Sequence, residues 1–430
     1  MSREMKQSGV PWLKDIPMDW NIERGKNVLV LQKRPVRDDD DVVTCFRDGE
    51  VILRSLRRTE GFTMSDKEIG YQGINQGDIV IHGMDGFAGA MGVSKSTGKG
   101  SPVLIVCTPK FDAIPQYLIY YLRALAMTDV FIALATGIRE RSCDLRWNKI
   151  SELEFILPSS TEQQEIAEFL DKKCGEVDEM IVLQEHIIEE LKAYRQSVIT
   201  EAVTKGLNPN VPMKDSGIEW IREIPEHWEV KPIKYNFDRR SEKNNPIKTT
   251  ERLSLSIDKG VTLYAEKTTN LDRFKDDFTQ YQLAYPNDIV LNCMNMIVGA
   301  VGLSKYKGCV SPVYYVIHPS KANINAEFYS YLLNIPTIRG LYHSYGKGIY
   351  AIERGEGRVN TCRLKVSYDD FGRFEIPIPP IYEQENIVSH IKMKCDEIDE
   401  LISIKQQKIE SLKEYKKSII YEYVTGKREV

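Results

Sequence analysis

The sequence predicts a mixed α/β protein with two globular modules, each followed by a long helix. Two observations lead to this fold class. Short sequence blocks recur in the same order about 210 residues apart, and each half ends in a heptad pattern of apolar residues. With 430 residues, the chain is long enough for several domains. We therefore expect one architecture that occurs twice, an internal repeat with pseudo-two-fold symmetry.

The repeat consists of blocks separated by an offset that grows along the chain. The offset is 208 residues for the first blocks, 210 for the middle ones and 221 for the last. The main pairs are Trp12 and Trp20 with Trp220 and Trp228, Asp78-Ile79-Val80 with Asp288-Ile289-Val290, Gly89 to Lys95 with Gly299 to Lys305, Ser101-Pro102-Val103 with Ser311-Pro312-Val313, and Lys173-Cys174 with Lys394-Cys395. Insertions between blocks explain the growing offset, so the sequence indicates a tandem duplication.

Each globular module contains short apolar runs separated by Gly, Pro and Ser. The runs at 77–81 and 103–106 are typical of strands, and longer apolar segments at 115–127 and 325–334 are typical of helices. The order of the strands cannot be derived from this pattern.

The two long helices are predicted by apolar residues that alternate at steps of three and four. The predicted seam of the coiled coil consists of Leu170, Val177, Ile181, Ile188, Leu191 and Val198 in the first copy and Ile391, Ile398, Ile402, Ile409, Leu412 and Ile419 in the second. Polar residues interrupt both seams at equivalent places, at 184 and 195 and at 405 and 416. Neither helix can bury its apolar stripe alone, so each needs the other copy or another chain. A helix lying along a globular core is the alternative.

These patterns divide the chain into five parts. The expected parts are residues 1–158, an N-terminal segment and the first module; 159–206, the first helix; 207–228, a linker and the start of the second repeat; 229–379, the second module; and 380–430, the second helix. Prolines precede both helices, and Thr161 is the expected N-cap of the first, with Gln164 three positions later.

Composition excludes several classes of protein. The net charge of −4 excludes a uniformly basic nucleic-acid binder, but the charge is unevenly distributed. Residues 159–206 have 5 basic and 11 acidic side chains, and residues 229–379 have 21 and 16. The start of the chain lacks the pattern of a signal peptide, and the most apolar stretch, 117–134, is interrupted by charges. Eight scattered cysteines without a Cys-x-x-Cys pair indicate reduced thiols, so we expect a cytoplasmic protein.

Familiar catalytic patterns are missing from the sequence. The segment 92–100 has the wrong spacing for a phosphate-binding loop, and no Asn/Asp-Pro-Pro-aromatic tetrapeptide of an adenine methyltransferase occurs. The six histidines include no pair at metal-binding spacing, and the acidic run 38–41 is typical of a solvated loop. A Gly-x-Ser-x-Gly motif is also absent. We therefore expect a non-catalytic chain with no metal and no cofactor of its own.

Cationic, aromatic and amide side chains cluster at matched positions of the two modules. Such residues on glycine-rich loops are suited to contact DNA phosphates and base edges. The candidate DNA-binding residues are Arg54, Arg57, Arg58, Arg139, Arg141 and Arg146 in the first module and Asn292, Asn295, Tyr345, Lys347, Arg354, Arg358 and Arg363 in the second. Each cluster alone is more often a solvated surface. Two matched modules with different loops favour a DNA site in two parts, with the helices fixing the distance between the contacts.

This layout resembles the specificity subunit of type I restriction-modification systems. The resemblance extends over essentially the whole chain, and its motifs are the paired Trp-x7-Trp openings, the Asp-Ile-Val strands, the Gly-Ala-x-Gly-x-Ser turns at 89–94 and 299–304, and the Glu-Gln-x-x-Ile helix starts at 162–166 and 383–387. The loop at 136–141 and the enlarged loop at 345–363 depart from the usual family pattern, so no base-reading residue is transferred from the family.

The resemblance implies a role for each part of the chain. Each module would be a target recognition domain that reads half of a bipartite double-stranded DNA site, and the two helices would pack antiparallel as spacers. Two modification (methyltransferase) subunits would bind S-adenosylmethionine and methylate adenine at N6. Restriction subunits would use ATP and Mg²⁺ for translocation and cleavage.

Two other functions are compatible with the sequence. A coiled-coil adaptor that binds proteins instead of DNA fits the acidic first helix and the near-neutral total charge. An enzyme with an unfamiliar site is the third possibility, and binding of S-adenosylmethionine by this chain alone would support it.

Overall fold

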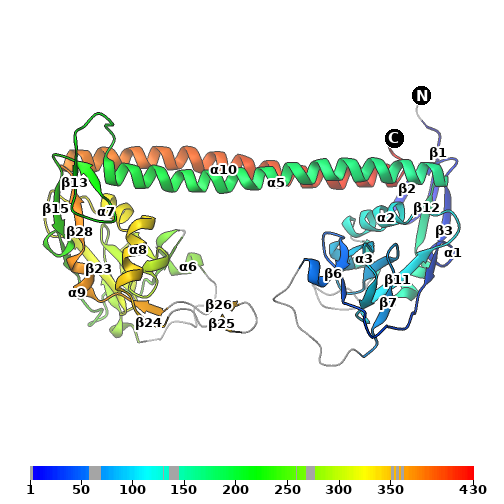
Figure 1. The fold of residues 1–430 in the computed structure, drawn as a ribbon, viewed down its shortest axis with the longest axis horizontal. Helices are drawn as coiled ribbons and strands as arrows, with labels where there is room; N and C mark the ends of the chain where they lie inside the picture. The colour runs from blue at the N-terminus through cyan, green and yellow to red at the C-terminus, as the bar shows by residue number, and fades with distance from the viewer. Residues whose placement is uncertain are drawn as a thin grey trace. The chain divides into compact units, whose positions relative to one another are not determined.

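The computed structural model describes residues 3–57, 69–128, 130–134, 145–257, 259–267, 277–349, 353–354, 358–359 and 363–430. The chain divides into two compact units (Figure 1). Unit 1 is Met1–His186 with Lys405–Val430, and unit 2 is Ile187–Ile404. Each unit therefore contains one globular module and part of each long helix, whereas the sequence assigned each helix to a part of its own.

The first module is built from antiparallel strand pairs around a four-stranded sheet. That sheet has the order β4-β11-β8-β9, with bounds Leu29–Leu31, Leu104–Pro109, Ile79–His82 and Met91–Val93. The other pairs are β1 (Met5–Val10) with β2 (Leu13–Pro17), β3 (Asn21–Arg24) with β12 (Glu154–Leu157), β5 (Val43–Cys45) with β6 (Val51–Leu53), and β7 (Gln72–Ile74) with β10 (Gly98–Gly100). The helices are α1 (Gly25–Val28), α2 (Pro115–Met127), α3 (Val130–Leu134) and α4 (Trp147–Glu152), with short 3-10 turns η1 (Arg54–Leu56) and η2 (Gly86–Ala88).

The second module repeats this topology. Its four-stranded sheet has the order β16-β23-β20-β21, with bounds Phe237–Arg239, Tyr314–Pro319, Ile289–Asn292 and Val301–Leu303. The other pairs are β13 (Met213–Asp215) with β14 (Glu223–Pro225), β15 (Glu229–Pro232) with β28 (Glu375–Ile378), β17 (Leu253–Ser256) with β18 (Gly260–Leu263), β19 (Gln282–Ala284) with β22 (Gly308–Val310), β24 (Lys347–Ile349) with β27 (Arg363–Lys365), and β25 (Glu353–Arg354) with β26 (Arg358–Val359). The helices are α6 (Tyr264–Lys267), α7 (Ala326–Leu332), α8 (Pro336–Tyr345) and α9 (Tyr368–Arg373), with the 3-10 turns η3 (Ile233–Tyr235), η5 (Phe278–Gln280) and η6 (Met296–Val298).

The predicted elements of the modules lie close to where the sequence placed them. The helices expected at 115–127 and 325–334 are α2 and α7, and the strands expected at 77–81 and 103–106 are β8 and β11. Each helix packs its aromatic side chains against the sheet, where the buried hydroxyls find backbone acceptors. Tyr117 donates to the carbonyl of Ile156 at 2.9 Å, and Tyr329 in the second module donates to that of Pro377 at 3.1 Å. The fold is therefore duplicated down to the hydrogen bonds of its core.

The two long helices are α5 (Ser160–Lys205) and α10 (Ile381–Val424), which run side by side in Figure 1. Within unit 1 the start of α5 packs against the end of α10, because the rings of Phe169 and Tyr423 lie 4.5 Å apart. Within unit 2 the end of α5 contacts the start of α10. The two helices run in opposite directions in both units and therefore form an antiparallel coiled coil. The apolar seam positions are buried or half-buried.

Two of the four polar interruptions of the seam, Arg195 and Lys416, form ion pairs with aspartates of the other helix. In unit 1 Lys416 Nζ lies 2.6 Å from Asp178 Oδ2, and in unit 2 Arg195 Nη2 lies 3.5 Å from Asp399 Oδ2. These pairs are equivalent under the shift of 221 residues. An ionic pair at one seam position favours one register of a coiled coil over others.

The helix starts differ from the predicted capping pattern. Ser159 caps α5, since its Oγ accepts a hydrogen bond from the backbone N of Glu162 at 3.2 Å, and Thr161 lies inside the helix. The prediction of Thr161 as the cap was therefore wrong by two residues. Buried Gln163 bonds to backbone groups of the module and of the segment before the helix, which sets the first helical turn earlier than the local sequence suggested.

The Glu-Gln motif of each helix start joins the helix to its module. Glu162 accepts from the indole Nε1 of Trp20 at 3.1 Å, and Glu383 accepts from that of Trp228 at 2.8 Å. The next residue, buried Gln163 or Gln384, bonds to a backbone group of the module and to a backbone carbonyl just before the helix. The Trp and Glu-Gln motifs, which lie more than 140 residues apart in the sequence, therefore form one contact in each unit.

None of the helices in the described ranges has both the length and the apolar character needed to cross a membrane.

Candidate nucleic-acid interface

The central strand of each module ends in the same turn. Strand β8 leads into η2 and strand β20 into η6, and both turns end in a glycine with positive φ, 91° at Gly89 and 94° at Gly299. This backbone conformation is strained for any residue with a Cβ, which explains the matched glycines. The side chains that the turns present are His82 and Asp85 in the first module and Asn292 and Asn295 in the second.

A buried aspartate paired with a half-buried arginine fixes the start of each central strand. Arg240 binds Asp288 through Nε at 2.7 Å and Nη2 at 2.9 Å, and Asp288 also accepts from the backbone N of Tyr285 at 2.8 Å. Arg34 and Asp78 form the same pair in the first module. The bond to Asp288 raises the pKa of Arg240 above its ordinary value, although burial opposes this shift. The Asp of each Asp-Ile-Val motif thus has a structural role.

A backbone hydrogen bond joins the turn after each central strand to the segment that follows the loop at 136–141 in the first module and the loop at 345–363 in the second. In the first module the backbone N of Leu145 donates to the carbonyl of Gly83 at 2.9 Å. In the second module Val366 donates to the carbonyl of Cys293 at 3.3 Å. Two candidate segments that are far apart in the sequence are therefore joined in the same way in both modules.

The second module gathers several of the predicted DNA-binding residues around this joint. Asn292 uses its Oδ1 to accept from the backbone N of Met294 at 3.1 Å, and Asn295 precedes η6. Lys347 is exposed on β24, in register with Lys365 of β27. Tyr345 is about half exposed at the end of α8, and its ring lies 5.0 Å from that of Phe374.

The structure describes the other candidate residues of the second module, and three of those in the first, only in part or not at all. Arg354 and Arg358 are paired across the β25–β26 hairpin and Arg363 begins β27, but the described structure of these three is limited to the backbone. Arg58, Arg139 and Arg141 lie outside the described residues.

The candidate residues that the structure describes in the first module differ in their contacts with the rest of the module. Arg57 forms ion pairs with Asp48 and Glu50 and lies over the ring of Phe46, and the bond to Arg57 lowers the pKa of Asp48. Arg54 Nε donates to Thr44 Oγ1 at 3.1 Å. Arg146 is exposed and directly follows Leu145, so it lies beside the joint described above.

The structure adds residues that the sequence interpretation missed. Arg239 lies over the rings of Tyr315 and Tyr368, at 5.2 and 4.8 Å from their centroids, and both Arg239 and Lys365 act electrostatically on Cys293 in the turn. Burial raises the pKa of Tyr315 to about 12, so the ring remains neutral beneath the cation. Lys365 is exposed and is the last of the four cations, Arg354, Arg358, Arg363 and Lys365, that follow the loop at 345–350 in the sequence.

The first module has a different set at the equivalent turn. Asp85 pairs with Arg47 at 2.9 Å, and His82 Nδ1 accepts from the backbone N of Asp85 at 3.0 Å. Burial lowers the pKa of His82, although the nearby Asp85 acts in the opposite direction. Aligning the two copies at their shift of 210 residues pairs His82 with Asn292 and Asp85 with Asn295, so the repeat itself was the signal for these positions.

The chemistry that this arrangement offers is recognition. In the described residues no cluster of three or more His, Cys, Asp or Glu side chains could hold a metal ion. Guanidinium, amide and ammonium groups on a rigid turn can donate hydrogen bonds to phosphates and base edges.

Comparisons with known proteins agree with this interpretation. No family model matches the chain. Among curated proteins, two from Methanocaldococcus jannaschii are each 24% identical: the putative type I restriction enzyme MjaX specificity subunit over 445 residues, covering 96% of this chain and 94% of the relative, and the type I restriction enzyme MjaVIII specificity subunit over 437 residues, covering 96% and 93%.

Solved structures share the fold. A chain from a structure described as the basis of complex assembly and conformational transition of the type I R-M system matches with a TM-score of 0.66 at 14% identity, over 96% of this chain and 99% of that one. The HsdS subunit from Thermoanaerobacter tengcongensis matches with a TM-score of 0.51 at 14% identity, over 96% and 98%.

The relationship extends over almost the full length of both kinds of match. It includes the duplicated modules and the antiparallel helices, as the motifs predicted. Specificity subunits are non-catalytic, in agreement with the prediction from the sequence. Over nearly its whole length the chain is therefore similar to type I restriction enzyme specificity subunits.

Proposed function

We propose that this chain binds a bipartite double-stranded DNA site, with one target recognition domain for each half. The observation that supports this most directly is the repeated joint between the central turn and the candidate loop. Its backbone is the same in both modules, whereas its side chains differ: His82 and Asp85 in one, Asn292 and Asn295 in the other. One framework with two sets of hydrogen-bonding groups suits two half-sites of different sequence.

The partners follow from the same proposal. Two modification subunits bind the chain and supply S-adenosylmethionine-dependent methylation of adenine at N6, and restriction subunits supply ATP- and Mg²⁺-dependent translocation and cleavage. This chain brings the complex to its DNA site and binds neither cofactor.

The proposal predicts that Asn295→Ala weakens recognition of one half-site alone. An Asn amide can form two hydrogen bonds with adenine, and the loss of such a contact costs about 1–3 kcal/mol. Binding is measured with the complex of this chain and its modification subunits, on the site identified from methylated adenines in the host genome. DNA altered in the half-site read by the second module should then bind the variant and the wild type more equally.

Asn386→Ala is the matched control, because Asn386 is an exposed amide on α10 in the same unit. It should leave both half-sites unaffected. Equal loss of affinity on DNA altered in either half would show that Asn295 does not read a base.

The alternative is a coiled-coil adaptor whose modules bind proteins. Salt dependence separates the two functions, since each phosphate contact releases counterions and makes affinity fall steeply with salt. Absence of salt-dependent binding to double-stranded DNA would favour the adaptor.

A further inference from the structure

Each unit joins its module to the start of a long helix through a tryptophan and a glutamate, which we call the Trp–Glu contact. In unit 1 this contact is Trp20 with Glu162, and Arg3 lies against it. The Arg3 guanidinium lies 2.5 Å from Glu162 Oε1 and 2.8 Å from Asp19 Oδ2. It also lies 5.3 Å from the centroid of the Trp20 ring. Two carboxylates and an aromatic ring therefore hold this cation.

In unit 2 the Trp–Glu contact is Trp228 with Glu383, and the cation is replaced. At the shift of 208 residues, Val211 takes the position of Arg3, and His227 takes that of Asp19. The hairpins β1–β2 and β13–β14 have the same register at this shift, so the alignment also holds in the structure. The repeat thus keeps the tryptophan and the glutamate but not the arginine.

Neutral hydrogen-bonding groups surround the glutamate in unit 2. Glu383 accepts from Trp228 Nε1 at 2.8 Å and from Tyr382 Oη at 3.0 Å. His227 Nε2 lies 2.6 Å from the same carboxylate. A carboxylate has about four acceptor positions, so these contacts leave room for a further donor. Tyr382 is 59% exposed, so its hydroxyl can turn to water when another donor approaches.

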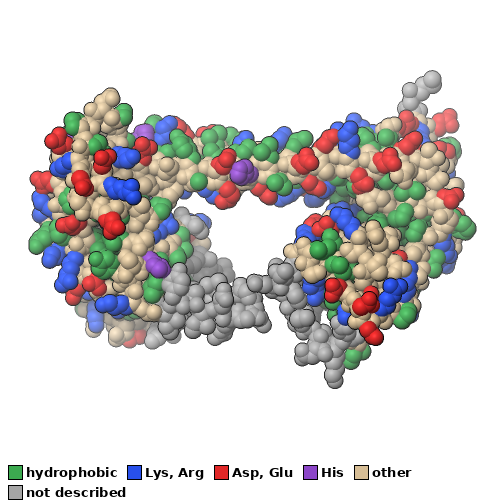
Figure 2. All heavy atoms as spheres, in the orientation of Figure 1, with side chains coloured by type: hydrophobic (Ala, Val, Ile, Leu, Met, Phe, Trp, Pro, Cys, Tyr) green, Lys and Arg blue, Asp and Glu red, His purple; other side chains and the backbone are tan. Residues whose placement is uncertain are grey.

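The negative charge of Glu383 has no permanent cation beside it. Figure 2 shows Lys and Arg side chains interspersed with Asp and Glu on the visible surface of both units. In the part of the chain that the structure describes, however, no Lys or Arg forms an ion pair with Glu383, and the imidazole of His227 is charged only when protonated. Because the Glu383 side chain is only 21% exposed, water solvates its charge poorly. A cation at this position would therefore be stabilising.

A cavity of about 460 Å³ lies beside Glu383. The residues that line it include Val211 and Glu383, the equivalents of Arg3 and Glu162, so it corresponds to the space that the arginine fills in unit 1. Its walls combine apolar side chains with the polar groups of the Trp–Glu contact, and include Leu207, Val211, Ile387, His227, Tyr382 and Glu383. Apolar walls suit the methylene stem of a long cation, and the carboxylate suits its head.

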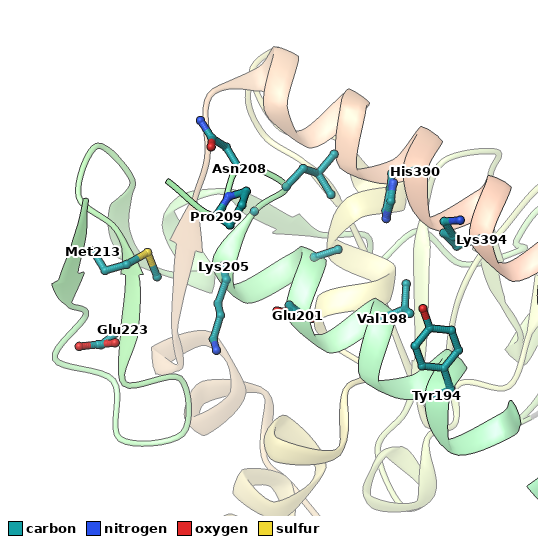
Figure 3. Close-up of a pocket in the computed structure, with 13 residues that line it drawn as sticks. Tyr194, Val198, Glu201, Lys205, Asn208, Pro209, Met213, Glu223, His390 and Lys394 are labelled. Atoms are coloured by element: carbon teal, nitrogen blue, oxygen red, sulfur yellow. The ribbon is translucent and has the colours of Figure 1, made fainter. Parts of the chain in front are cut away.

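A second cavity of about 620 Å³ shares residues 207–208 with the first. Figure 3 shows that its walls include two lysines, Lys205 and Lys394, and two glutamates, Glu201 and Glu223. The opposite charges balance, so this cavity has no excess of negative charge. The first cavity is lined by one carboxylate and by no Lys or Arg, so a cation favours the first cavity over the second.

We propose that the cavity beside Glu383 binds an alkylguanidinium group, which takes the place that Arg3 fills in unit 1. A guanidinium presents a planar fork of N–H groups that pairs with both oxygens of a carboxylate, and its apolar stem would lie against Val211 and Ile387. A free guanidine compound and an arginine of another protein chain share this chemistry. The inference does not rest on DNA binding, so its test is independent of the proposed function.

The test uses the full-length chain with nitrogen-15 in its tryptophans, because the indole N–H groups of Trp20 and Trp228 report on the two Trp–Glu contacts. In NMR titrations, n-butylguanidinium should shift the Trp228 resonance and leave that of Trp20 in place, since Arg3 occupies the unit 1 site. The uncharged n-butylurea, which has the same shape, should bind roughly tenfold more weakly or worse. Equal binding of the two compounds overturns the proposal.

The repeat also supplies variants that exchange the two sites. Val211→Arg should fill the cavity from within the chain and weaken n-butylguanidinium binding at Trp228 by about tenfold or more. Asn210→Arg adds the same charge at an exposed neighbour that does not line the cavity, and should leave binding unchanged. Arg3→Val should open the unit 1 site, so that Trp20 responds as well. The site is wrong if Val211→Arg and Asn210→Arg have the same effect.

Two further compounds distinguish the sources of the group. Agmatine is a free guanidine compound, and N-acetylarginine methylamide reproduces an arginine within a protein chain. Tighter binding of agmatine identifies a small molecule as the ligand, and tighter binding of the blocked arginine identifies a side chain of another protein. If neither compound shifts the Trp228 resonance, the cavity is not a guanidinium site.

Discussion

Asp288 shows how a recurring residue can be essential for the fold without contacting DNA. Its carboxylate is almost fully buried and satisfies both the Arg240 guanidinium and the backbone N of Tyr285. The sequence identified the Asp-Ile-Val motif through its repetition at 78–80 and 288–290. The arginine partners, Arg34 and Arg240, belong to strands or loops about 45 residues earlier, and nothing in the local pattern connects them to the motif.

We predict that Asp288→Ala destabilises the protein by about 3 kcal/mol, because it leaves a partly buried guanidinium and a backbone N–H without an acceptor. Urea unfolding measures the loss. Glu229→Ala is the control, since it removes an exposed ion pair with Lys231 and should cost less than about 1 kcal/mol. Equal effects of the two substitutions would refute the structural role of Asp288.

At the scale of helices and strands, local periodicity decided what the sequence could predict. The heptad pattern predicted α5 and α10 because seam residues at steps of three and four identify a helix without knowledge of its partner. Strand order depends on pairing between distant segments, so β4-β11-β8-β9 could not be derived. Helix starts fell between these cases. Thr161 was favoured by its own sequence, but the contact of Gln163 with the module sets the start of α5.

The first turn of α10 gives a prediction about pH. Burial alone would raise the pKa of Glu383, but hydrogen bonds from Trp228, His227 and Tyr382 outweigh this effect and lower it below the ordinary value. The ionised form is therefore the one that stabilises the fold. Its contribution is complete above the ordinary glutamate pKa and is lost as the pH falls through the lower pKa of the folded state.

Glu383→Gln should accordingly destabilise the protein by about 2 kcal/mol at pH 7, the size expected for hydrogen bonds to a charged group. The difference from the wild type should shrink as urea unfolding is repeated at pH 4 and pH 3. Glu385→Gln, an exposed acid in the same turn, is the control and should show little effect at any pH. A difference that stays constant with pH would mean that the charge of Glu383 does not contribute.

For the whole molecule, the duplication was the most informative feature of the sequence. It predicted two modules of one fold, and it related positions such as His82 and Asn292 that no motif would have connected. The candidate DNA-binding residues stay predictions, because a basic cluster in the sequence does not by itself identify a DNA contact. Arg57 shows why: a cation in a basic cluster can be held by Asp48 and Glu50 of its own module, and acidic partners from other strands are invisible in the local sequence.

The continuous helices lead to a prediction about the DNA site as a whole. We expect the coiled coil to determine the spacer between the two half-sites. Deleting residues 184–190 together with their repeat equivalents 405–411 removes seven residues from each helix and preserves the heptad phase. At 1.5 Å per residue, each helix shortens by about 10 Å, the length of about three base pairs. The spacer that the complex binds best should become shorter by about that amount.

The measurement uses DNA duplexes that keep both half-sites and vary the spacer one base pair at a time. Deletion of 184–190 alone is the control, because it shifts α5 against α10 and separates the ion pairs Lys416–Asp178 and Arg195–Asp399 from their register. This variant should lose stability instead of acquiring a new preferred spacer. If the paired deletion folds, binds DNA and still prefers the original spacer, the distance between half-sites is set by the modules and not by the helices.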